Sequence, residues 1–312
     1  MKCILTAMVF LISFPALSKC GFELFVSTIN YVASDVNPVT AQNLELYRKE
    51  GGSSCGHFAI GFSRGNAGSY NRIATNSMNG ATLSYNLYKT NSAETPLRSL
   101  KDAHSHSQIL NGTIGKKETK NLNYFFKLLS SNSSNVLRAG LYSDTVLVEA
   151  GRDEDDLEDS EREVRVPLPI RIVVPTNISL SLVDSGADHN PTSTSKILDF
   201  GELSLNQELG FDVRVVSNAG YALSVSSVNN QKLAVEPNSL GIEGQIGYDF
   251  YARNSLKNLS SSSSSPVLID SRTGSTPIQG VSVPIRVVIK SVDNKISGIY
   301  KDYVTFTISA TE

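Results

Sequence analysis

The sequence predicts an all-β protein made of two β-sandwich domains. Much of the chain consists of short runs in which apolar and polar residues alternate, separated by Gly, Asn and Ser. Alternation with a period of two is typical of a strand that buries one face. Such strands at regular spacing, with few amphipathic helical patterns between them, favour sandwiches over helical or mixed architectures.

One stretch occurs twice and predicts the two-domain organisation. The run that begins at Gly140 (GLYSDTVLV) returns at Gly298 (GIYKDYVTF), with Gly, Tyr, Asp and alternate apolar residues at the same spacing. A Tyr just inside such a strand, whose hydroxyl locks the preceding turn, is typical of the penultimate strand of immunoglobulin-like sandwiches. Another alternating strand follows the first copy, whereas the second copy is followed by only a few residues.

Residues 1–18 have the pattern of a secretory signal peptide. One positive charge at Lys2 precedes an apolar run from Ile4 to Leu17, and small residues lead to Ser18. The run is too short to span a membrane. A buried N-terminal helix is the alternative, but nothing amphipathic follows the run. We expect cleavage after Ser18 and export.

The cysteine pattern supports export. Cleavage leaves Cys20 and Cys55 of the three cysteines. In an exported chain, two cysteines favour a disulfide over a metal pair or free thiols. Closing a loop of this length stabilises a domain by roughly 3–4 kcal/mol through its effect on the unfolded chain. Signal peptide and disulfide together indicate an oxidising compartment, the periplasm or the outside.

Length and composition set further bounds. The 312 residues suit two domains of ordinary size, and a hydrophobic content of 40% is enough for two cores. The 12 Tyr and 12 Phe compensate for the absence of Trp. A net charge of −2 leaves no electrostatic footprint for nucleic acid or an anionic membrane.

We assign residues 19–175 to the first domain. Strands are expected at residues 22–26, 59–62, 83–88, 121–129 and 141–148. The stretch 121–129 also suits one helical turn, but a strand is favoured.

An acidic run at residues 152–163 is expected to form a solvated loop. Calcium loops need ligands at alternate positions and a turning Gly, which this run lacks. Residues 164–174 then alternate without a break, with Pro167 and Pro169 facing outward. Proline confines this strand to an edge or to pairing on one side. We predict that it is the last strand of the first domain, which thereby completes itself.

Residues 176–312 form the expected second domain. Its strands are predicted at residues 177–182, 197–203, 211–216, 221–225, 247–251, 281–289 and 300–308. This domain contains no cysteine, so packing alone must stabilise it.

The residues that resemble chemical motifs do not assemble a site. The sequence GFSRG around Ser63 matches a nucleophile elbow, but turn residues and not a helix follow it. His104 and His106 lack a third metal ligand at a suitable spacing. Arg72 and Arg171 are interpreted as surface or strand-edge charges. We therefore expect no enzymatic activity, no metal and no cofactor.

The first domain resembles the spore coat protein U domain and the related subunits of archaic, Csu-like chaperone–usher pili. The likeness rests on a cysteine near the mature start, CGHFAIGFSRG from Cys55, NRI from Asn71, LSYNLY from Leu83 and GLYSDTV from Gly140. The usual Trp of the family after LSYNLY is missing, and Thr95 begins the TPL that stands there. This departure concerns the local loop.

The second domain resembles the same pilin type more distantly. The matching stretches are FGEL from Phe200, VSNAGYAL from Val216 and GIYKD from Gly298. Together the two likenesses cover most of the mature chain.

The resemblance implies incomplete sandwiches. Subunits of this family lack a final strand and are finished by an N-terminal extension of their neighbour. A tip subunit has two domains and no extension to donate. The chain fits this pattern, because few residues precede Cys20 and the chain ends on the second copy of the repeated strand. The first domain can complete itself, whereas the second would keep a donor-strand groove lined by Tyr300, Val304, Phe306 and Ile308.

The resemblance therefore implies a tip adhesin that mediates surface attachment or biofilm formation. Its implied partners are a periplasmic chaperone, an outer-membrane usher, a neighbouring pilin that donates a strand, and an unknown surface ligand. It would pass through the periplasm to the cell surface. The alternative is a structural spore-coat or outer-surface protein that polymerises by strand exchange. Ile109, Leu110 and Ile114 are candidate adhesive residues of a Gly/Asn-flanked loop, or else ordinary packing residues.

Overall fold

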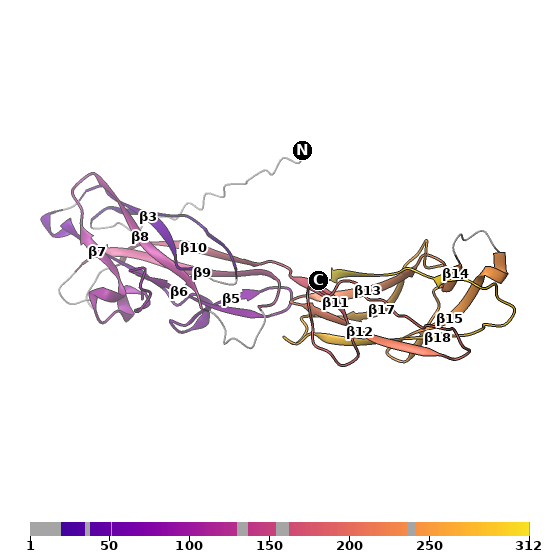
Figure 1. Ribbon diagram of the computed structural model, residues 1–312. Coiled ribbons are helices and arrows are strands. Elements are labelled where there is room, and N and C mark those ends of the chain that lie inside the picture. Colours follow the sequence, from indigo (N-terminus) through magenta and orange to yellow (C-terminus); the bar gives the residue numbers. More distant parts are fainter. Residues whose placement is uncertain are drawn as a thin grey trace. The chain divides into compact units, whose positions relative to one another are not determined.

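The computed structural model describes residues 20–34, 38–50, 52–129, 137–153, 162–235 and 241–311, so the signal-peptide prediction and most of the acidic run lie outside it. The described residues form two compact units, the first with residues 20–129 and 140–174 and the second with residues 137–139 and 175–311. Their regular structure consists of strands and short 3-10 turns (Figure 1). No helix among these residues has the length and apolar character needed to cross a bilayer. The predicted all-β, two-sandwich fold is confirmed.

The first unit contains four 3-10 turns among its described residues, η1 (Ser53–Gly56), η2 (Gly65–Ala67), η3 (Leu100–Asp102) and η4 (His106–Gln108). Its strands are β1 (Phe22–Val26), β2 (Ile29–Val32), β3 (Thr40–Arg48), β4 (His57–Phe62), β5 (Arg72–Asn76), β6 (Thr82–Tyr88), β7 (Leu110–Thr113), β8 (Glu118–Leu128), β9 (Gly140–Arg152) and β10 (Arg162–Val174).

The strands of the first unit close around one core. They follow the order β1-β3-β8-β6-β5-β9-β10-β2, with β4 beside β9 and β7 beside β4. Because β1 and β2 are consecutive in the chain but lie at opposite ends of this path, the sheet wraps around the buried side chains. Aromatic rings fill the centre, with Phe126 4.9 Å from Tyr31 and 5.4 Å from Tyr85 between ring centroids. Rings at such separations add to the stabilisation from burial.

β10 lies beside β9 in the sheet and occupies one edge of β9. It pairs antiparallel with β9 along its length and parallel with β2 over four residues, and Figure 1 shows β9 and β10 side by side. Its inward-facing Leu168, Ile170 and Ile172 are fully buried. Burial of an aliphatic side chain of this size stabilises by about 1.5–3 kcal/mol, so β10 is a substantial part of the core.

The two prolines of β10 lie where no second neighbour is present. The N–H of Ala33 donates to the carbonyl of Val173 at 2.8 Å, so the backbone groups of odd-numbered residues in β10 face β2. β2 reaches only from Ile170 to Val173. The missing N–H groups of Pro167 and Pro169 therefore fall beyond β2, and no ladder hydrogen bond is lost.

A disulfide fixes the start of the first unit. Cys20 and Cys55 are bonded, with their Cα atoms 5.4 Å apart, and both are buried. The predicted disulfide is thus confirmed. Cys20 lies just before β1, and Cys55 lies in η1, the turn that precedes β4. The disulfide therefore holds the first strand covalently to that turn.

The interpretation of Arg72 as a surface or strand-edge charge is wrong. Its side chain is fully buried. Nε donates to the carbonyl of Ser63 at 2.9 Å, and Nη2 donates to the carbonyls of Phe62 and Leu97 at 3.0 and 2.7 Å. Nη1 donates to Oδ1 of Asn86 at 2.6 Å. Burial lowers the pKa of Arg72 to about 10. The alternating pattern predicted the strand correctly but could not show that two loops bring acceptors to this guanidinium.

The second unit has a single 3-10 turn among its described residues, η6 (Gly241–Gly244). Its strands are β11 (Ile178–Val183), β12 (Glu208–Ser217), β13 (Gly220–Ser227), β14 (Lys232–Val235), β15 (Gln245–Ala252), β16 (Ser255–Lys257), β17 (Val267–Arg272), β18 (Val281–Ile289), β19 (Tyr300–Lys301) and β20 (Val304–Thr311).

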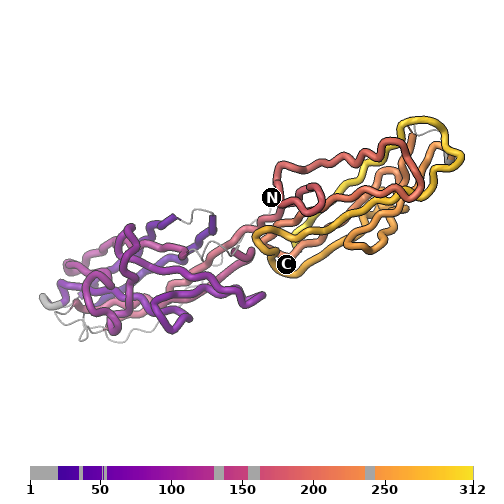
Figure 2. The backbone as a smooth tube through the Cα atoms, turned by 60° about the horizontal axis from the view of Figure 1, so that its bottom comes forward, coloured from indigo at the N-terminus to yellow at the C-terminus, as the bar shows by residue number. Residues whose placement is uncertain are grey.

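Two sheets face each other in the second unit. One has the order β11-β12-β18-β15-β14-β19, with β16 beside β15, and the other has the order β17-β13-β20. The yellow end of the chain in Figure 2 runs along this unit as β20. Among the described residues β11 pairs only with β12, and β20 pairs only with β13. Each of these strands therefore has one open edge. The strand predicted at residues 197–203 is wrong, because this segment has no strand partner.

Replacing Arg72 tests its structural role. Arg72→Met should destabilise the first unit by about 3 kcal/mol or more, because several buried carbonyl and amide acceptors lose their donor. Arg171→Met, at an exposed position of β10, should change the stability by less than about 0.5 kcal/mol. Chemical denaturation of both variants gives the comparison, and equal effects would contradict the assignment.

Candidate site: an open groove in the second unit

The repeated sequence motif has the same structural role in both units. In the first, the hydroxyl of Tyr85 donates to Asp144 at 2.6 Å, and in the second the hydroxyl of Tyr248 donates to Asp302 at 2.6 Å. Burial, and then the nearby carboxylate, raise the pKa of both tyrosines well above its usual range. β9 is therefore the counterpart of β19 and β20 together.

The two carboxylates also hold loops in place. Asp144 accepts the backbone N–H of Asn66 at 3.1 Å, and Asp302 accepts that of Asn229 at 3.0 Å. The hydroxyl of Tyr300 donates to the carbonyl of Ile296 at 2.6 Å, which locks the preceding turn as the motif predicted.

Equivalent side chains of the two units differ in burial. In β9 they are fully buried, whereas in β19 and β20 they are half-buried. The equivalent pairs are Tyr142 and Tyr300, Val146 and Val304, Val148 and Phe306, and Ala150 and Ile308. The difference arises because β10 pairs with β9, while no strand in the described part of the second unit pairs with the second edge of β20.

The open edge borders a groove of about 870 Å³. Its lining includes apolar and aromatic residues of the large sheet, namely Phe211, Leu233, Ile246, Tyr248, Phe250 and Val287. Tyr300, Val304 and Phe306 of β19 and β20 line it as well, and so do Leu198, Phe200 and Leu203 of the segment before β12. The ring of Phe306 lies 5.8 Å from that of Phe211 in an edge-to-face contact.

Ile308 is not among the residues that line the groove. It packs against the same core at the end of the unit where β11 approaches β20. Of the four residues predicted to line a donor-strand groove, the structure thus brings three to the groove and places the fourth beyond its end.

The groove is suited to binding an extended chain. An open strand edge presents unpaired N–H and C=O groups, and the apolar walls present side chains that water solvates poorly. An added strand satisfies both by pairing with the edge and inserting alternate apolar side chains. No group of three or more metal-ligating side chains is present among the described residues. The arrangement supports binding of an extended chain.

The prediction of an adhesive loop at residues 109–114 needs correction. Ile109, Leu110 and Ile114 are all buried. Leu110 begins β7, which pairs with β4, and Ile109 packs against Leu100 and Ala103. The flanking Asn and Gly belong to a strand and not to a projecting loop. These three side chains therefore pack inside the unit and cannot contact a surface.

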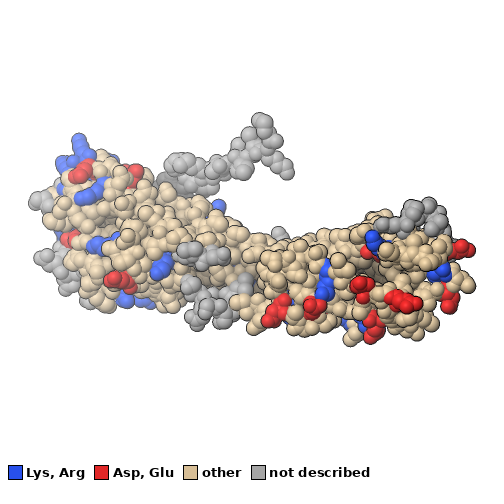
Figure 3. Space-filling model, viewed as in Figure 1, with Lys and Arg blue, Asp and Glu red and all other residues tan. Residues whose placement is uncertain are grey.

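The end of the first unit opposite Val174 instead presents polar side chains. Thr90, Asn91, Ser92, His104, Ser105, Ser107, Lys116 and Lys117 are exposed there. Hydrogen bonds order part of this end, since Lys89 Nζ donates to Asn111 Oδ1 at 2.8 Å and His106 Nε2 lies 3.2 Å from Asp153 Oδ1. On the faces shown in Figure 3, acidic and basic side chains are interspersed.

The serine of the GFSRG sequence has a structural role. Its hydroxyl accepts the backbone N–H of Leu147 at 2.8 Å, which joins the loop after β4 to β9. The three-residue turn η2 follows it in place of a helix, so the strand–turn–helix geometry of a nucleophile elbow is not formed at Ser63.

Comparison with known proteins identifies the first unit. Residues 10–149 match the family model of the Spore Coat Protein U domain. The part of the first unit up to residue 149 falls within this match. The predicted resemblance is confirmed for this unit. The match ends within β9, so β10 and the second unit lie outside it. Proteins of this family are structural and non-enzymatic, in agreement with the prediction of no enzymatic activity.

Solved structures are similar at low identity. A chain of the CsuC–CsuE chaperone–tip adhesion subunit pre-assembly complex of Acinetobacter baumannii is 12% identical, with a TM-score of 0.40, over 92% of this chain and 99% of that chain. The CupB6 tip adhesin of Pseudomonas aeruginosa is 11% identical, with a TM-score of 0.45, over 93% of this chain and 95% of that chain. No curated protein matches the sequence of this chain.

A pair of equivalent substitutions tests whether the groove is open. Val146→Asp buries a charge beneath β10 and should destabilise the first unit by about 3 kcal/mol or more. Val304→Asp places the same charge in a groove that water reaches, and should destabilise the second unit by about 1 kcal/mol. Calorimetry combined with limited proteolysis assigns each unfolding transition to its unit. Equal costs at the two positions would mean that the groove is closed in solution.

Proposed function

We propose that the chain is the tip adhesin of an archaic chaperone–usher pilus and that a neighbouring pilin inserts a strand into the groove of the second unit. The observation that carries the proposal is the contrast between two equivalent strands. β10 pairs with β9 in the first unit, while β20 has an open edge beside an apolar groove. The match of the first unit to the Spore Coat Protein U domain supports the same assignment.

The free energy of the open groove implies assembly partners. Several apolar side chains there are half-buried, and each forfeits part of the roughly 1.5–3 kcal/mol that full burial provides. Summed over these side chains, the forfeited burial energy is comparable to the roughly 5–15 kcal/mol by which a domain is typically stable. An empty groove can therefore cancel most of the stability of the second unit. We propose that a periplasmic chaperone covers the groove until the outer-membrane usher exchanges it for the donor strand.

The division of labour follows from the two units. In the first unit, β10 occupies the position that a donor strand would take, so this unit needs no donor and is left free to contact a surface. The second unit instead receives the donor strand and joins the chain to the pilus. The polar end of the first unit, opposite Val174, is the proposed contact surface, since Ile109, Leu110 and Ile114 are buried. The chain would reach the cell surface through the periplasm.

A fused donor strand tests the groove. A copy of residues 163–174, joined after Glu312 by a short flexible linker, can turn back and run antiparallel to β20. It should raise the melting temperature of the second unit by more than about 10 °C, because several kcal/mol of apolar burial are added. The first unit should melt as before.

A matched control carries Asp at the copied positions of Leu168 and Ile170 and should give no gain. Calorimetry measures both fusions against the unfused chain. If the unfused second unit is already fully stable and the intact copy adds nothing, the groove does not receive a strand.

Substitutions at the polar end test adhesion. Asn91→Ala with His104→Ala removes exposed hydrogen-bonding groups without touching the core, so pili should assemble normally while surface attachment falls several-fold. Met78→Ala, an exposed change outside this end, is the control. Pilus number by electron microscopy and attachment are measured in parallel. Attachment equal to that of the control would show that this end is not the contact surface.

A further inference from the structure

A lysine, an asparagine and an aspartate meet at the end of the first unit opposite Val174. Lys89 follows β6, Asn111 lies in β7, and Asp153 follows β9. The amine of Lys89 donates to Oδ1 of Asn111 at 2.8 Å, and Nδ2 of Asn111 donates to Oδ2 of Asp153 at 3.2 Å. The side-chain amide of Asn111 therefore has an amine at its oxygen and a carboxylate at its nitrogen.

Backbone contacts hold these three side chains in place. The amine of Lys89 also donates to the carbonyl of His106 at 2.8 Å, and Asn111 is fixed in the β4–β7 ladder. The N–H of Asp153 donates to the carbonyl of His57 at 3.2 Å. The side chain of Asp153 is only 12% exposed, while Lys89 and Asn111 are half-buried. Groups from separate segments are thus brought together by the fold itself.

Burial prepares Lys89 to act as a nucleophile. An amine attacks only in its neutral form. Withdrawal from water lowers the pKa of Lys89, although the negative charge of Asp153 partly opposes this, so the neutral fraction rises. The plane of an Asn amide turns readily about its last side-chain bond. Such a rotation lets the amide carbon of Asn111 face the amine at the roughly 3–3.5 Å from which such groups react.

We propose that Lys89 and Asn111 become joined by an isopeptide bond, with Asp153 as the catalytic acid and base. The neutral amine of Lys89 attacks Cγ of Asn111, and a new C–N bond forms. Asp153 takes a proton from the attacking nitrogen and gives a proton to Nδ2 of Asn111. The old C–N bond then breaks and ammonia leaves. The reaction needs no oxidant, reductant or further reactant.

The bond would link two strands that do not pair with each other. In the described sheet, β6 pairs with β5 and β8, whereas β7 pairs with β4. The cross-link would also close the loop of residues 90–110, which carries exposed polar residues such as Thr90, Asn91 and His104. A cross-link limits the freedom of the unfolded chain, so this end of the unit should resist unfolding. The bond forms whether or not the chain is an adhesin.

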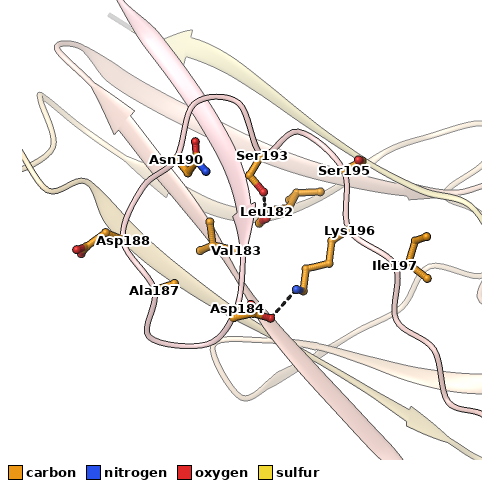
Figure 4. A pocket seen from close by; sticks show the side chains of 10 residues that line it. All are labelled: Leu182, Val183, Asp184, Ala187, Asp188, Asn190, Ser193, Ser195, Lys196 and Ile197. Carbon is orange, nitrogen blue, oxygen red and sulfur yellow. Dashed lines mark hydrogen bonds and ion pairs between the residues drawn. The ribbon is translucent and has the colours of Figure 1, made fainter.

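A lysine–aspartate contact in the second unit provides an internal reference. Figure 4 shows Lys196 reaching Asp184. The side chain of Asp184 is 87% exposed, so water competes for both groups. We expect an ordinary surface ion pair at this position and no covalent bond.

Mass spectrometry of the purified protein tests the isopeptide bond. After reduction of the disulfide, the intact chain should be lighter than its sequence by the mass of one ammonia. Trypsin does not cleave after an acylated lysine, so residues 73–98 should be joined to residues 102–116 in one branched peptide. Lys196 and Asp184 should remain unlinked. If prolonged incubation of the folded protein yields only separate peptides, the proposal is overturned. Hydrolysis of Asn111 to Asp, without the branched peptide, overturns it equally.

Three variants separate the roles of the residues. Lys89→Arg keeps the positive charge but removes the nucleophile, so the branched peptide should disappear. Lys101→Arg, the matched exposed change at the same end, should leave its amount unchanged. Asp153→Asn keeps the size of the side chain but cannot carry the proton, so the bond should form more than about tenfold slower. Bond formation by Asp153→Asn at the original rate overturns the catalytic role of Asp153.

Discussion

The strand that carries the Gly-x-Tyr-x-Asp motif must be covered on its second side, and this requirement governs both units. Its inward side chains are apolar and its outer edge carries backbone groups that need partners. In the first unit β10 meets both needs, so Val146 and Val148 are fully buried. In the second unit the same positions remain half-buried beside a groove. The internal repeat makes the first unit a template for the second.

Much of the fold could be predicted because the relevant signals are local. A period of two is visible within a single strand, so the segments that became β1, β8, β10 and β18 were identified from their own residues. The Cys20–Cys55 bond followed from the export signal and the number of cysteines left. The turn-locking role of Tyr300 followed from its place just after a glycine-led turn.

The errors have a common physical origin, because burial and pairing depend on distant parts of the chain. Ile109 and Leu110 lie among polar residues in sequence, but β4 and η3 cover them. Arg72 occupies an ordinary strand pattern, yet its acceptors come from the end of β4 at Phe62 and from the loop at Leu97. In residues 197–203, apolar and polar side chains alternate as in a strand, but no strand of the described chain pairs with this segment. A pattern shows which face a residue prefers but not what lies opposite.

The continuity of β10 with the second unit has a mechanical consequence. β10 ends at Val174, and Pro175 already belongs to the second unit. Tension that separates the units therefore pulls on β10 from its C-terminal end, along its own axis. Because β10 is flanked by β9 and β2 near this end, it can slide out only by breaking both ladders together. Bonds loaded in shear share the force, whereas bonds unzipped one at a time do not. The strand that completes the core of the first unit is thus also the strand that carries tension from the second unit.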